Sequence, residues 1–136
     1  MIIDATDKIL GRMATFTAKK ALAGEDVVII NAEKAIMSGS KKDILNKFKA
    51  RRDRGDSIHG PHYPRMPDKI VRRAIRGMLP TKKASGTIAY KKVKVYIGTP
   101  EGIKADDIKL NSKENLKDKR YMILEDICEW LGARWN

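Results

Sequence analysis

The chain has 136 residues, of which 42% are hydrophobic, and it carries a formal net charge of +12. This length fits one domain over residues 1–136 with a proper hydrophobic core, and the composition excludes a mainly disordered chain. No apolar run is long enough to span a membrane, and the first residues lack the apolar stretch of a signal peptide, so we expect a cytoplasmic protein.

The first 31 residues predict a strand, a helix and a second strand. Residues 1–4 have the pattern of a short buried strand, and residues 9–23 have apolar side chains at helical spacing, with Thr6 or Asp7 available as the helix cap. Residues 26–31 form a run of mostly β-branched residues, as expected for a strand that is covered on both faces. A strand–helix–strand unit places its two strands in parallel, so the sequence predicts an α/β fold.

A turn at residues 38–42, with the sequence Ser-Gly-Ser-Lys-Lys, leads into a predicted helix over residues 41–52. Backbone N–H groups at such a helix start can hold a phosphate. The Walker pattern, however, requires two glycines and a Lys-Ser/Thr pair at fixed spacing, and this turn has one glycine followed by two lysines. A plain helix N-cap is therefore the better interpretation, and a nucleotide-using enzyme built on this turn is the weaker alternative.

The segment between this helix and the next, residues 54–67, contains three prolines and is long for a loop in a compact domain. Proline fixes φ and removes a hydrogen-bond donor, so we expect a stiff, extended and functional arm. His59 and His62 do not predict a zinc site, because no third or fourth ligand has suitable spacing nearby. His62 and Tyr63 are instead expected to stack on bases or to pack on sugar edges.

A strongly amphipathic helix is predicted over residues 69–79, with Asp68 as its N-cap and Pro80 after its end. At about 100° per residue, apolar side chains cover one face and cations gather on the opposite face. The apolar positions are Ile70, Val71, Ala74, Ile75, Met78 and Leu79, and the cationic positions are Lys69, Arg72, Arg73 and Arg76. A solvated face is the common interpretation of such a pattern, but it usually mixes both signs of charge, and this face has no carboxylate.

The excess positive charge lies in the middle of the chain. Residues 41–94 contain 17 Lys or Arg and 4 Asp or Glu, whereas the rest of the chain has 12 basic and 13 acidic residues. Such a field attracts polyanions, and nucleic acid is the commonest polyanion in a cytosol. An acidic membrane surface is the lesser alternative, because it favours a basic helix with Trp or Phe on its apolar side, and residues 69–79 have neither.

The last third of the chain predicts smaller elements. Residues 87–92 can form one or two helical turns, residues 93–97 a strand that joins the sheet, and residues 101–119 a loop or a short helical piece. A C-terminal helix is expected over residues 121–131, with Gly132 at its end.

Catalysis and metal binding are not predicted. The single cysteine, Cys128, excludes an internal disulfide and lies on the apolar side of the last predicted helix, so we expect a core residue instead of a nucleophile. No Ser/His/Asp grouping or close acidic pair marks a catalytic centre, and we predict no cofactor, no metal ion and no small-molecule substrate. The candidate nucleic-acid-binding residues are Lys41, Lys42, Arg51, Arg52, Arg54, His59, His62, Tyr63, Arg65, Lys69, Arg72, Arg73, Arg76, Lys82 and Lys83.

Several short motifs together resemble those of one protein family. They are Leu10-Gly11-Arg12, Asn31-Ala32-Glu33, His59-Gly60-Pro61, Arg76-Gly77-Met78-Leu79-Pro80 with the following Lys82, Lys83 and Gly86, and Gly98-Thr99-Pro100. Through these motifs, the chain resembles family thirteen of the large ribosomal subunit proteins (the L-thirteen family), in its archaeal and eukaryotic form, over about its first 100 residues. Ala84 and Ser85 depart from the pattern, because a further basic residue is expected there.

The resemblance implies a three-layer α/β/α domain around a mostly parallel four-stranded sheet, with a basic extension. It also implies binding to large-subunit ribosomal RNA, contacts with neighbouring large-subunit ribosomal proteins, and a structural, non-catalytic role in the large ribosomal subunit. A free RNA- or DNA-binding regulatory protein, such as a messenger RNA-binding translational repressor, is the alternative function.

On this interpretation, we expect the arm to be mobile in the free protein and to become ordered on RNA. His62, Tyr63 and Arg65 would then supply stacking and phosphate contacts. The alternative is a loop that is held on its own domain by Ile58, Tyr63 and Met66.

Overall fold

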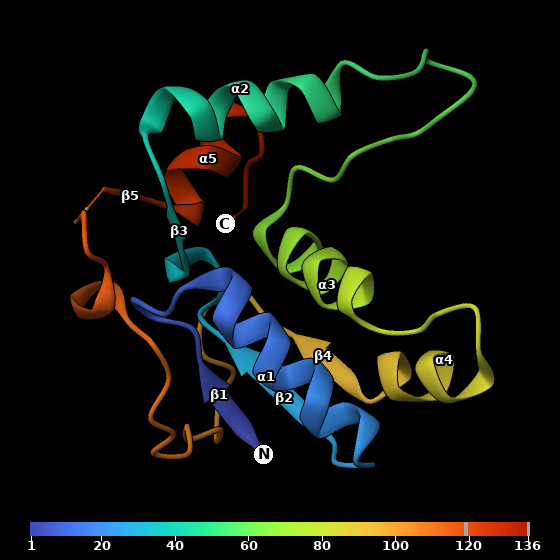
Figure 1. The fold of residues 1–136 in the computed structure, drawn as a ribbon, viewed down its shortest axis with the longest axis vertical. Coiled ribbons are helices and arrows are strands. Elements are labelled where there is room, and N and C mark those ends of the chain that lie inside the picture. The colour runs from blue at the N-terminus through green and yellow to red at the C-terminus, as the bar shows by residue number, and fades with distance from the viewer. Residues whose placement is uncertain (119, 136) are drawn as a thin grey trace.

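The structure is a computed structural model that describes residues 1–118 and 120–135. Its parallel sheet contains β1 (Ile2–Asp4), β2 (Val27–Ile30) and β4 (Val93–Val95) in the order β1-β2-β4, as Figure 1 shows. Ile3 of β1 pairs with Ile29 of β2, which in turn pairs with Val95 of β4. The predicted parallel pair is therefore confirmed, and β4 joins it as a third parallel strand.

Helix α1 (Leu10–Leu22) connects the first two strands, and its buried side chains recur at helical spacing. Gly24 follows the helix with a φ of 97°, a conformation that glycine adopts at little cost. The predicted cap is wrong, because Ile9 is the N-cap residue and no side chain caps the helix. Asp7 instead adopts a left-handed conformation, and its carboxylate pairs with Lys113 at 2.9 Å.

A second, antiparallel sheet joins β3 (Ile36–Ser38) to β5 (Tyr121–Ile123). The sequence does not predict β3, and the expectation of a helix over residues 121–131 is wrong for its first three residues, which form β5. Helix α5 (Leu124–Trp130) begins directly after β5 and is followed by Gly132 with a positive φ. Ile36 and Leu124 are fully buried, so this small sheet contributes to the core.

Helix α2 (Lys41–Arg52) begins where the sequence predicts. Ser40 is its N-cap, and the Ser40 hydroxyl accepts a hydrogen bond from the backbone N–H of Asp43. Ile44 and Phe48 are the buried residues of this helix. Figure 1 shows α2 beside α5, at the end of the molecule away from the parallel sheet.

Helices α3 (Pro67–Met78) and α4 (Ala84–Lys91) follow the arm and pack on α1 and β4. The predicted N-cap of α3 is wrong: Asp68 lies inside its first turn, because Pro67 occupies the first helical position, where its missing N–H costs nothing. Residues 84–86, which the sequence does not assign to a helix, form the start of α4.

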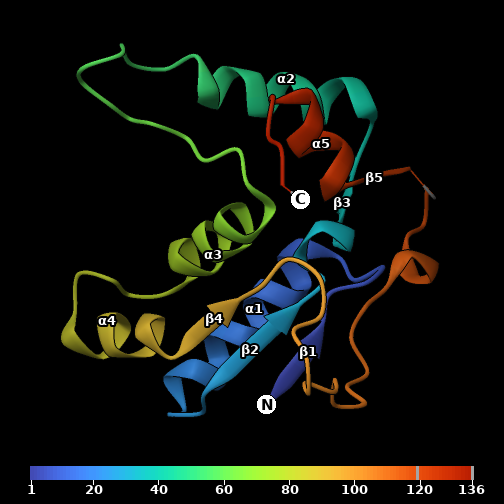
Figure 2. The same ribbon diagram turned by 180° about the vertical axis from the view of Figure 1, so that it is seen from behind.

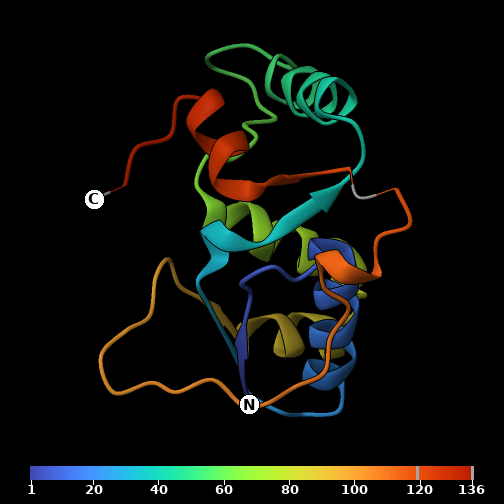
Figure 3. The ribbon, with the colours of Figure 1, turned by 90° about the vertical axis from the view of Figure 1, so that its left-hand side faces the viewer.

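The helices α1, α3 and α4 lie on one side of the parallel sheet, and Figures 2 and 3 show the loop after β4 on the other side. On that other side, Val28 is half-buried and its neighbour Lys94 is exposed. The expectation that residues 26–31 are covered on both faces therefore holds only in part. The parallel sheet has three strands instead of the expected four, and the three-layer arrangement is not confirmed.

The loop after β4 protects the β1 edge of the sheet. Asp106 accepts a hydrogen bond from Ile2 N at 2.7 Å, and its own N–H donates to Ile2 O at 2.9 Å. The short helices η1 (Ala32–Lys34) and η2 (Lys113–Asn115) complete the fold, and η2 is the helical piece that the sequence allows in this loop. In the part of the chain that the structure describes, no helix combines the length and apolar character needed to cross a membrane.

Burial of the single cysteine agrees with its assignment to the core. Cys128 lies on α5 with no exposed surface. Desolvation, together with the nearby carboxylates of Asp68, Glu125 and Glu129, raises the pKa of its thiol to about 12. The thiol is therefore protonated at neutral pH and is not an activated nucleophile.

Candidate nucleic-acid interface

The cationic face of α3 is exposed, as predicted. Its four cations, Lys69, Arg72, Arg73 and Arg76, all lie on the solvent side of the helix. The predicted apolar positions are buried or half-buried, with the exception of Met78, whose side chain is 44% exposed. The assignment of the two faces is thus confirmed for the helix as a whole and is wrong for Met78.

Two aromatic rings position two of these arginines. The guanidinium of Arg73 lies over the ring of Tyr63, 4.8 Å from its centroid, and that of Arg72 lies over the ring of Tyr90 at 4.7 Å. Such cation–π contacts use the flat face of the guanidinium and leave the N–H donors on its edge free for a ligand. Helix α3 therefore presents guanidinium groups whose directions are partly fixed before any ligand binds.

Tyr63 joins the arm to α2. Its ring is buried and meets Phe48 edge to face, with 5.9 Å between the ring centroids. Its hydroxyl accepts a hydrogen bond from Arg51 Nη1 at 3.3 Å, and its carbonyl accepts one from Arg52 Nη1 at 2.7 Å. Tyr63 thus packs on its own protein, and the exposed His62 is better placed than Tyr63 to stack on a base.

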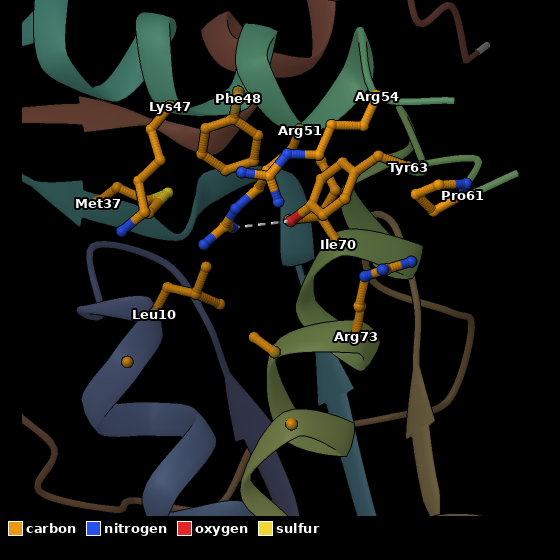
Figure 4. Close-up of a pocket in the computed structure, with 13 residues that line it drawn as sticks. Leu10, Met37, Lys47, Phe48, Arg51, Arg54, Pro61, Tyr63, Ile70 and Arg73 are labelled. Carbon is orange, nitrogen blue, oxygen red and sulfur yellow. Dashed lines mark hydrogen bonds between the residues drawn. The ribbon is translucent and has the colours of Figure 1, made fainter. Parts of the chain in front are cut away.

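A cleft of about 440 Å³ opens between α1, α2, α3 and the arm, as Figure 4 shows. The side chains of buried apolar residues, among them Leu10, Phe48 and Ile70, form its floor. The cations that line it are Lys47, Arg51, Arg54 and Arg73. Among the described residues that line this cleft, none carries a carboxylate.

A shallower groove runs along α3 and continues the same positive surface. It is lined by Pro64, Lys69, Arg72, Arg73, Arg76 and Tyr90. Because Arg73 lines both the cleft and the groove, the two form one continuous region, which we call the basic surface. It brings together side chains from α1, β3, α2, the arm, α3 and α4.

The other predicted residues lie outside the cleft and the groove. The exposed ones are Lys41, Lys42, His59, His62, Arg65, Lys82 and Lys83. Lys41 and Lys42 lie at the start of α2, whereas Arg51 lies in its last turn, so the helix separates them from the cleft. These residues surround the basic surface and do not form one compact site with it.

Among the cationic and tyrosine side chains of the basic surface, sequence reasoning missed Lys47 and Tyr90. Lys47 and Arg51 are four residues apart on α2, a spacing typical of one helical face, so the pattern could have identified Lys47. Tyr90 has no comparable signal, because it acts by supporting Arg72 from a different helix.

Within the described residues, no Lys or Arg side chain of the basic surface forms an ion pair. In residues 1–118 and 120–135, the ion pairs are Lys20–Glu25, His59–Asp56 and Lys113–Asp7. The cations of the basic surface take part in none of them, so their field is available to an external polyanion.

Comparison with known proteins identifies relatives over the whole chain. The family model described as Ribosomal protein L13 matches residues 1–102. A protein of Methanococcus maripaludis is 43% identical, with 99% of each chain covered, and one of Methanocaldococcus jannaschii is 41% identical, with 98% of each chain covered. A protein of Halobacterium salinarum is 41% identical over 98% of this chain and 91% of its own. All three are named large ribosomal subunit protein uL13. The chain therefore belongs to the ribosomal protein L13 family.

Proposed function

We propose that this chain is a structural constituent of the large ribosomal subunit and that the basic surface binds large-subunit ribosomal RNA. The observation that carries the proposal is the face of α3, on which four exposed cations stand without a carboxylate. The names of the relatives, each a large ribosomal subunit protein, support the choice of partner.

We also propose the partners, the location and the role of the protein. Its partners are ribosomal RNA and neighbouring proteins of the large subunit, its location is the cytoplasm, and its role is structural instead of catalytic. The exposed residues around the basic surface, such as Lys41, Lys82 and Lys83, would serve as outlying phosphate contacts.

Sedimentation tests this function. The tagged chain, expressed in a related archaeon, is expected to remain with the large subunit in a sucrose gradient that contains high salt. Recovery of the chain in the free fraction, together with binding to messenger RNA, would favour a regulatory protein instead. Binding of ATP by the purified chain would favour the nucleotide-using enzyme.

The affinity for RNA is expected to depend strongly on salt concentration, because Lys and Arg side chains that bind phosphates displace the counterions condensed on the RNA. With on the order of six phosphate contacts, log K should fall against log salt concentration with a slope of about −4 to −5. Filter binding at several salt concentrations measures this slope. A slope near zero would show that the basic surface is not the binding surface.

We propose that only part of the arm is mobile in the free protein and becomes ordered when RNA binds. Its second half is held in place through Tyr63 and the half-buried Met66, as the alternative expectation requires. Ile58, the third residue of that alternative, is 82% exposed and does not hold the loop. We therefore infer that the mobile part in the free protein is the tip, residues 54–60.

Limited proteolysis tests the state of the tip. Trypsin is expected to cut the free protein at Arg54 before Arg65, because Arg65 follows the anchored Tyr63, and both sites should be blocked in the ribosomal particle. An Arg54→Gln variant, which removes the first cutting site, controls for cleavage elsewhere. Equal resistance in the free and bound states would mean that the tip is already ordered, and the proposal would be dropped.

A further inference from the structure

We propose that the cleft of the basic surface binds one unpaired nucleotide of RNA, with the base inserted between α1, α2 and α3. This inference rests on the RNA-binding function proposed above and adds a specific subsite to it. The groove along α3 can follow a phosphate backbone of any sequence, whereas the cleft would recognise a place where a base leaves its helix.

The chemistry of the cleft complements that of a nucleotide. Its volume of about 440 Å³ lies in the range of pockets that enclose small ligands. The floor is apolar, with Leu10, Phe48 and Ile70, and the rim is cationic. A nucleotide combines a flat, weakly polar base with a charged phosphate, so the base fits the floor and the phosphate fits the rim. Bases in a duplex are stacked on both faces, so the base must be unpaired.

The guanidinium groups at the rim are prepared for this role. Arg51 lies over the rings of Phe48 and Tyr63, at 5.9 and 5.6 Å from their centroids, and Arg73 lies over Tyr63 from α3. Figure 4 shows Arg51 beside the hydroxyl of the tyrosine and Arg73 below the tyrosine ring. Guanidinium planes of this kind stack on unpaired bases and donate hydrogen bonds to phosphates from their edges.

Two glycines in the cleft point to close approach by a ligand. Gly11 of α1 and Gly77 of α3 both line it, and a Cβ atom added at either position would meet nothing within 4 Å. Glycine is a poorer helix former than alanine, and here Gly11 is the second residue of α1 and Gly77 the penultimate residue of α3. The packing of this chain does not require glycine at either position, whereas a nucleotide that contacts the helix backbone does.

An acidic segment of a neighbouring protein would also be attracted by the rim. Binding of a carboxylate, however, requires neither an apolar floor nor glycine in the helices that line the cleft. These features of the cleft therefore favour the nucleotide. The two occupants can be separated by experiment, because only the nucleotide would be bound when the RNA is free of other proteins.

The test uses a Gly11→Ala/Gly77→Ala double variant of the full chain, each single variant, and Asn46→Ala as a matched control. Asn46 is exposed on α2 and does not line the cleft, so its replacement also favours the helix without changing charge. The probe is a transcript of the cognate large-subunit ribosomal RNA. The measurements are melting temperature, dissociation constant at several salt concentrations, and chemical probing of unpaired bases.

The double variant is expected to melt at the same temperature as the natural chain or about 2 to 5 °C higher. Its affinity for the transcript should nevertheless fall roughly tenfold, the loss expected when one base contact is blocked. The salt slope should not change, because no charge is removed. One or two unpaired bases, protected by the natural chain, should become reactive again, and Asn46→Ala should change none of these binding properties.

Other results would overturn the inference. If the double variant and both single variants bound the transcript and protected its unpaired bases as well as the natural chain does, the cleft would not be a nucleotide site. The proposed RNA binding would still stand. Unchanged binding to free RNA with weaker entry into the subunit would assign the cleft to a protein segment. Failure of the natural chain itself to bind the transcript would instead refute the proposed function.

Discussion

Replacing Ile75 with alanine is expected to lower the free energy of unfolding by roughly 2–5 kcal/mol, as is typical of a deleted core isoleucine. Ile75 has no exposed surface and lies on the side of α3 that packs on α1 and β4. The truncation removes apolar contacts and leaves a cavity that the rigid helix cannot close. Urea denaturation measures the loss as a lower transition midpoint with little change in slope. RNA binding should be lost only where the variant unfolds.

Arg76 is the matched control, because it follows Ile75 on the same helix and faces solvent. Arg76→Ala should leave the unfolding midpoint within about 0.5 kcal/mol of the natural value. It should weaken RNA binding and make the salt slope shallower by about one, since one phosphate contact is removed. If Arg76→Ala unfolded the protein and Ile75→Ala left its stability unchanged, the two faces of α3 would be assigned the wrong way round.

Gly86→Ala should destabilise the protein by about 1–3 kcal/mol, although alanine is the better helix former. Gly86 is buried in α4, where an added Cβ would collide with the carbonyl group of Pro80 and lie 3.0 Å from Thr81 N. The turn that contains Lys82 and Lys83 would have to move to make room. We therefore expect a lower melting temperature together with weaker RNA binding.

Ser85 provides the comparison for Gly86. It is the preceding residue of α4 and is exposed, so Ser85→Ala should be neutral or slightly stabilising. If Gly86→Ala were as stable as Ser85→Ala, the close approach between α4 and the turn after Pro80 would not exist in solution.

The main features of the fold follow from local patterns that the sequence displays. The separation of Ile75 from Arg76 on α3 follows from helical periodicity, and the parallel β1–β2 pair follows from the length of its connection. Strand β5 could not be predicted in this way. Tyr121–Ile123 continues the apolar spacing of α5, and its extended form depends on pairing with β3, which is distant in sequence.

The candidate interface was predictable in its charge and less so in its shape. The positive charge of α3 follows from helical periodicity, which places its four cations on one face without a carboxylate among them. The position of Tyr63 could not be predicted from the sequence, because a tyrosine among prolines is compatible with both an exposed arm and a buried contact. Its position depends on Phe48, which belongs to α2 and approaches the arm only in the folded chain. Such tertiary contacts have no signature in a single sequence.

The pairing of β3 with β5 has a consequence for biosynthesis. Ile36 finds its partner, Ile123, only when nearly the whole chain has left the ribosome that makes it. Helix α2 rests partly on β5, so the basic surface lacks one of its supports until synthesis is almost finished. Closing so long a loop slows folding, and for that interval the nascent chain carries its positive charge on an incompletely folded segment.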